Sequence, residues 1–75
     1  METEIHIGML IRQKLKEDGR SAVWLARKMN RERSAVYKIF KAQDINTCQL
    51  AQISVILKYN FFVHYTDYVA MKMKV

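Results

Sequence analysis

Side chains that could bind an anionic partner gather in the stretch 32–41. If this stretch is helical, Val36, Ile39 and Phe40 share one face. The opposite face carries hydroxyl, phenol and ammonium groups, with a guanidinium at the flank of the first turn: Ser34, Tyr37, Lys38, Lys41 and Arg33. Such groups can hydrogen-bond the base edges and phosphates of a nucleic acid. In an isolated helix the same pattern would indicate only a solvated face. The elements around the helix must therefore show whether this face binds a nucleic acid.

The positive charge of the chain is concentrated around this stretch. The 75 residues carry a formal net charge of +6. Residues 12–41 contain ten basic and three acidic side chains, which sum to +7, whereas residues 42–75 sum to +1 and residues 1–11 to −2. A positive field of this kind attracts polyanions and speeds their encounter. Charge alone is common on solvated faces and does not identify the partner.

Periodic apolar residues predict the helices that would hold this stretch in place. With two Gly, no Pro and 51% hydrophobic residues, the chain is expected to form one all-α domain over residues 1–75. Repeats at helical spacing predict four helices, over about 5–18, 21–29, 32–41 and 47–58. Gly19 suits the end of the first helix, and Ser21 and Asn46 suit N-caps. Asn30 lies where a turn between two helices needs a positive φ.

The C-terminal segment allows more than one structure. Asn60 can cap a short fifth helix over 61–66, whereas the alternation in 71–75 is typical of a strand or a frayed end. The tail 67–75 therefore stays open between helix, strand and disorder. Phe61 and Phe62 either fill the small core or belong to a dimer interface, because aromatic residues are enriched in both.

A dimer interface would use the apolar side chains that the helix patterns leave outside the core: Trp24, Tyr65, Tyr68 and Val69. Trp24 points away from the apolar face of its helix, and an exposed Trp on so small a domain needs a covering surface. The simplest cover is the C-terminal tail.

Nothing in the sequence indicates an enzyme, a metal site or a cofactor. Cys48 is the single cysteine, and it forms no cluster with His6 or His64. His6 is expected to be a capping or solvated residue, and no nucleophile has an adjacent base. No run approaches the roughly 18 apolar residues of a membrane span, and the N-terminal residues lack a signal-peptide pattern. We therefore expect a cytoplasmic protein without a small-molecule ligand.

In order and spacing, these segments resemble the Cro and lambda-repressor type of helix-turn-helix protein, the XRE-like family. Four pieces carry the resemblance: IGMLIR at 7–12, Ser21 with LA at 25–26, RSAVYKIF at 33–40, and LAQISVIL at 50–57 followed by NFF at 60–62. Three positions depart from the family pattern. Asn30 stands where Gly is usual, Arg31 where an apolar residue is usual, and Ala22 where Gln is frequent.

The resemblance implies a compact four- to five-helix domain that binds double-stranded DNA sequence-specifically, as a homodimeric, repressor-like transcriptional regulator. In the family's docking, the third helix enters the major groove. The positions that touch bases match Arg33, Ser34 and Lys38. Phosphate contacts are expected from six further residues: Ser21, Arg31, Tyr37, Lys41, Arg20 and Arg27.

Two alternatives stay open. Because a fold does not dictate a function, the chain could be a protein-interaction module that keeps the helix-turn-helix fold without binding DNA. Its binding surface would then be Trp24 and the aromatic tail. RNA binding through the same basic surface is the other alternative, although the chain lacks the glycine loops and sheet aromatics of common RNA-binding modules.

Overall fold

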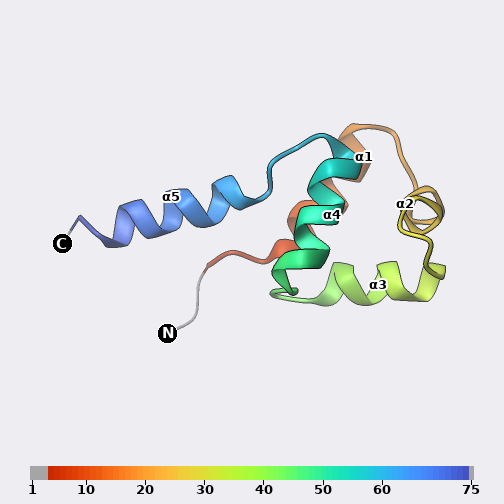
Figure 1. Cartoon of the computed structure of the whole chain (residues 1–75), viewed down its shortest axis with the longest axis horizontal. Coiled ribbons are helices and arrows are strands. Elements are labelled where there is room, and N and C mark those ends of the chain that lie inside the picture. Colours follow the sequence, from red (N-terminus) through yellow and green to blue (C-terminus); the bar gives the residue numbers. More distant parts are fainter. Residues whose placement is uncertain (1–3, 75) are drawn as a thin grey trace.

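The computed structural model describes residues 4–74, which are helical without any strand (Figure 1). Five helices follow one another: α1 (Ile7–Glu17), α2 (Ala22–Lys28), α3 (Arg33–Lys41), α4 (Thr47–Leu57) and α5 (Phe62–Lys72). The first four form a cluster, and α5 projects from it on the side opposite α2 (Figure 1). The projection gives the molecule its long axis, with extents of 43 × 22 × 21 Å. The expected all-α class is confirmed.

Short polar side chains start three of the helices. His6, Ser21 and Asn46 each accept a hydrogen bond from the backbone N–H three residues later, at 3.2, 3.1 and 2.7 Å. Each bond satisfies one of the amides that the first turn of a helix leaves without an intrahelical partner. The two predicted N-caps are confirmed, and His6 is a capping residue.

Three helices end in the same way. A residue in the left-handed conformation follows α1, α2 and α4: Gly19 (φ 66°), Asn30 (φ 55°) and Lys58 (φ 54°). After each of them, the next backbone N–H donates to the carbonyl five residues earlier, at 2.8, 2.8 and 3.1 Å respectively. This is the Schellman arrangement, which strongly favours Gly. The sequence predicted Gly19 and Asn30 in these positions, whereas Lys58 carries no local signal for a left-handed backbone.

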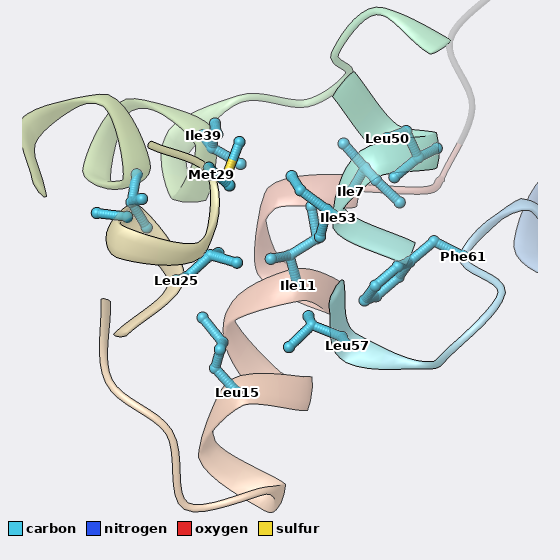
Figure 2. Packing of buried hydrophobic residues seen from close by; sticks show 12 residues of the cluster. Ile7, Ile11, Leu15, Leu25, Met29, Ile39, Leu50, Ile53, Leu57 and Phe61 are labelled. Carbon is cyan, nitrogen blue, oxygen red and sulfur yellow. The ribbon is translucent and has the colours of Figure 1, made fainter. Parts of the chain in front are cut away.

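One apolar core joins α1 to α4 and the start of the C-terminal segment (Figure 2). The buried side chains come from every helix except α5: Ile7, Ile11, Leu15, Leu25, Ala26, Met29, Val36, Ile39, Leu50, Ile53, Leu57 and Phe61. Phe61 is 1% exposed and Phe62 is half-buried against the same cluster. Figure 2 shows the Phe61 ring beside Leu57. The Phe61 ring therefore belongs to the core of a single chain.

The N-terminus of α1 is joined directly to the C-terminus of α3. The backbone N–H groups of Ile7 and Gly8 donate to the carbonyls of Gln43 and Ala42, at 3.0 and 3.1 Å. A Cβ atom added to Gly8 would lie 2.1 Å from the carbonyl oxygen of Ile39. Only Gly permits this approach, because any side chain would force the two helices apart.

The structure decides among the alternatives that the sequence left open for the tail, and it extends the fifth helix beyond the expected 61–66. Helix α5 continues to Lys72, and residues 73–74 form a turn, so the strand alternative is wrong for the described residues; Val75 lies outside them. The reason is physical: residues 4–74 contain no strand that could pair with it, so the backbone groups find partners only within a helix. Asn60 is not the N-cap: that position is Phe61, whose side chain makes no capping hydrogen bond, although the Asn60 Oδ1 atom one residue earlier accepts from the Phe62 N–H at 3.1 Å.

Replacing Gly8 tests the α1–α3 junction. We expect Gly8→Ala to lower the free energy of unfolding by about 3 kcal/mol, because its neighbours there are backbone atoms that cannot move aside easily. Gly19→Ala is the control, since nothing lies within 4 Å of its added Cβ and only the left-handed backbone opposes it. That variant should lose roughly 1–2 kcal/mol. Equal losses in urea unfolding would contradict the close approach.

Truncating Phe61 tests whether the ring is part of the core of one chain. Phe61→Ala should lower the free energy of unfolding by about 3–5 kcal/mol at any protein concentration, because it removes a fully buried ring. Phe62→Ala, which truncates the half-buried neighbour, should cost less. An unchanged melting temperature combined with a loss of dimers would instead assign Phe61 to an interface.

Candidate functional site

The turn between α2 and α3 sets the direction in which α3 leaves. Asn30 takes the left-handed conformation, its N–H donates to Arg27 O at 3.1 Å, and the Arg31 N–H donates to Ala26 O at 2.8 Å. These bonds close the last turn of α2 and turn the chain sharply into α3. Arg31, which follows Asn30 in this turn, is exposed.

Helix α3 has one buried side and one exposed side. Val36 is fully buried and Ile39 is 5% exposed, which locks the rotation of the helix about its axis. The predicted outward residues are all exposed, and we call them the α3 face: Arg33, Ser34, Tyr37, Lys38 and Lys41. The periodicity therefore predicted correctly which side chains reach solvent. The Tyr37 ring stands edge-on to Phe40, with 6.0 Å between centroids, and this contact orients the phenol.

No carboxylate within residues 4–74 forms an ion pair with the charged groups of the α3 face. Throughout residues 4–74 the structure has one ion pair, between Lys14 and Asp18 at 3.2 Å. Glu32, which precedes α3, makes no capping hydrogen bond with its side chain. The ammonium and guanidinium groups of the α3 face are thus available to an external anion.

The further phosphate candidates divide into two groups. Ser21 and Arg27 are exposed on α2 or at its start, as is Arg31 in the turn. The Ser21 oxygen accepts the Trp24 N–H at 3.1 Å, which leaves its O–H hydrogen available for donation. Arg20 is placed differently, because its guanidinium lies over the Trp24 ring, 4.7 Å from the centroid. It lines a pocket to which α3 contributes no residue.

The four predicted interface residues are not brought together. Tyr65, Tyr68 and Val69 lie on α5, whereas Trp24 lies on α2 at the other end of the long axis (Figure 1). The expectation that the tail covers Trp24 is therefore wrong. The indole is half-buried beside the last residues of α4 instead, because α5 leaves the cluster on the opposite side.

Helix α5 presents apolar groups to solvent. None of its residues is buried, and Val69 and Met71 are 49% and 57% exposed. A groove of about 750 Å³ runs between α5 and α1, and it is lined by Met9, Leu10 and Tyr68 among others. We call it the α1–α5 groove. Such an apolar surface is suited to a protein partner.

Tyr65 links α5 to the rest of the molecule. Its ring packs against the core, and burial raises the pKa of its phenol above the ordinary value, with a further contribution from the negative charge of Asp44. A tyrosine with an ordinary pKa is already neutral at pH 7, and the raised pKa keeps the Tyr65 phenol protonated to higher pH still. The base of α5 is anchored by this ring and Phe62, while its outer turns extend beyond the core.

Other chemistry has little support in the described part of the chain. Residues 4–74 contain no group of three His, Cys, Asp or Glu side chains that could hold a metal ion. Cys48 is exposed. The Tyr59 hydroxyl and His64 Nε2 are 2.9 Å apart, a pair that ties the end of α4 to α5. None of the described helices is both long and apolar enough to cross a membrane.

Two basic residues that sequence patterns did not single out belong to the pocket beside Trp24. Lys28 Nζ lies 5.7 Å from the centroid of the indole, and Lys58 lines the same pocket from the end of α4. The spacing of Arg20, Trp24 and Lys28 by four residues was a signal that could have revealed the first part of this cluster. Lys58 is far away in the chain and could not be placed without the fold.

The chain matches no known family model, no curated protein and no solved structure, so the interpretation of these surfaces depends on their geometry and charge.

Proposed function

We propose that this chain binds double-stranded DNA sequence-specifically as a lambda-repressor-like helix-turn-helix protein, and that it acts as a small repressor-like regulator. The observation that carries the proposal is the α3 face. Its basic and hydroxyl groups are exposed without an ion-pair partner in residues 4–74, while Val36 and Ile39 hold the opposite side of the same helix in the core. A rigid helix with such a face is well suited to the major groove.

In this proposal α3 enters the groove with its N-terminal end first. An α-helix is roughly 10–12 Å across, which fits a major groove about 12 Å wide. Arg33 would donate two hydrogen bonds to guanine, and Ser34 and Lys38 would contact neighbouring base edges. Tyr37 and Lys41 would contact phosphates, which set the position of the helix without reading sequence.

Phosphate contacts from α2 and the turn would complete the docking. Ser21, Arg27 and Arg31 are exposed near the two ends of α2 and can reach a DNA backbone that runs past α3. Each phosphate that the two arginines neutralise releases condensed counterions and so makes the affinity depend on salt.

We also infer that the protein binds as a homodimer, with α5 in the interface. The exposed Val69 and Met71 and the α1–α5 groove favour association, and α3 contributes no residue to the lining of that groove. Two chains joined there would leave both α3 faces open. A two-fold dimer would read two half-sites, and the DNA site would share that symmetry.

A second candidate function is a protein-interaction module without DNA binding. The α1–α5 groove favours it, because an apolar groove can serve a protein partner whether or not α3 meets DNA. The two candidates differ in the use of the α3 face. Selection of bound sites from random duplex DNA separates them: a palindromic consensus supports the proposed function, and the absence of enrichment supports the interaction module.

Salt dependence is the first quantitative test. With three cationic phosphate contacts per subunit, from Arg27, Arg31 and Lys41, log K for duplex DNA should fall with log[salt] with a slope near −3 per subunit. Fluorescence anisotropy of a labelled duplex at several salt concentrations measures the slope. An affinity that does not change with salt would contradict the proposal.

Two variants of α3 separate base contacts from phosphate contacts. Arg33→Ala should cost about 1–3 kcal/mol on the selected site and relax the preference at one base position, because a bidentate guanine contact is lost. Lys41→Ala should weaken binding to all sequences alike and reduce the salt slope by about 1. If both variants select the same sites with the same stringency, the division between base and phosphate residues is wrong.

A further inference from the structure

A basic pocket lies between α2 and the end of α4, separate from the α3 face. Its volume is about 600 Å³, and no residue of α3 lines it. Three cations and an indole define it: Arg20, Lys28, Lys58 and Trp24. We call it the α2–α4 pocket. Ile56 and Leu57 form its apolar wall.

Trp24 holds two of the cations in place. The guanidinium of Arg20 and the ammonium of Lys28 lie 4.7 and 5.7 Å from the centre of the indole, from positions four residues before and after it. The ring attracts both cations through its π-system. Because both long side chains are already oriented, an anion that binds them loses less of its binding free energy to side-chain ordering.

The pocket carries excess positive charge. Its single carboxylate is Asp18, whose Oδ1 atom is 3.2 Å from Lys14 Nζ and so already has a cation partner. Arg20, Lys28 and Lys58 have no carboxylate within ion-pair distance among residues 4–74. Because the described residues supply these three cations with no counter-ion, a multiply charged anion can pair with more than one of them.

The backbone at Lys58 is unfavourable for the fold alone. Its φ of 54° is the left-handed conformation that Gly19 and Asn30 occupy at the ends of α1 and α2. A lysine is poorly suited to it, because its Cβ crowds the following carbonyl oxygen. Gly would complete the same helix end with less strain. What Lys58 adds is an ammonium group at the edge of the pocket.

We propose that the α2–α4 pocket binds a phosphate group. A guanidinium and two ammonium groups suit a dianion with several oxygens better than a single carboxylate, because each cation can take a separate oxygen. The phosphate has two possible sources: a small phosphate ester, or a DNA backbone phosphate outside the contacts of α3. The second source depends on the proposed function, and the first does not.

Trp24 is the only tryptophan in the chain and reports on the pocket directly. Titration with pyrophosphate at constant ionic strength should change its fluorescence saturably, because the bound anion adds negative charge beside the two cations that contact the indole. Lys58→Gly should raise the melting temperature by roughly 2–6 °C through relief of backbone strain. The same substitution should weaken pyrophosphate binding at least tenfold. Arg20→Gln should also weaken it at least tenfold, and Lys74→Ala, a matched loss of charge outside the pocket, should change neither property.

Competition between duplex DNA and pyrophosphate distinguishes the two sources of the phosphate group. If the backbone supplies the phosphate, a duplex with long flanks competes with pyrophosphate, and Lys58→Gly weakens DNA binding. If a small ester supplies it, the duplex does not compete and Lys58→Gly binds DNA within twofold of the parent chain. Pyrophosphate binding without any DNA binding would overturn the proposed function but not this pocket. A non-saturable signal, or equal pyrophosphate affinity in Lys58→Gly and the parent chain, would overturn the pocket.

Discussion

The approach of α1 to the C-terminal end of α3 is the constraint on which the arrangement of the helices depends. Two backbone hydrogen bonds, from Ile7 and Gly8 to Gln43 and Ala42, replace the side-chain contacts that usually separate packed helices. Because backbone atoms meet directly, the distance and direction of α3 relative to α1 are fixed to within the range that a hydrogen bond allows. Apolar burial then fixes its rotation. The α3 face is held by both effects, and it is rigid for that reason.

The ends of the helices supply the second set of constraints. Gly19, Asn30 and Lys58 turn the chain through the same left-handed conformation, but they differ in how readily they adopt it. Gly meets no Cβ penalty and Asn meets a small one, whereas Lys meets the full cost. The least suitable residue is also the one that adds a charge to the α2–α4 pocket. Backbone strain that a different residue would avoid is often found at binding sites.

Helix α2 connects the two basic regions of the molecule. Its N-cap residue, Ser21, lies at the start of the segment that leads to α3, and Trp24 on its outer side orients the cations of the α2–α4 pocket. One short helix thus carries groups for both regions. The apolar α5 lies at the other end of the long axis and leaves both of them open (Figure 1). The two proposals therefore use separate surfaces, one for protein association and one for anion binding.

The sequence by itself determined the features that depend on neighbours a few residues away. Helical periodicity predicted the four clustered helices and the exposed side of α3, and the capping roles of Ser21 and Asn46 followed from their side chains. The tertiary structure alone decided the features that depend on distant residues. Position 8 requires Gly because the carbonyl oxygen of Ile39 lies where a Cβ atom would be. Trp24 lies beside the end of α4 and not beside the tail. Helix α5 stays helical because the described chain offers no strand with which it could pair. Arg20 and Lys58 share a pocket only because α2 packs beside the end of α4, a contact between segments that no local pattern records.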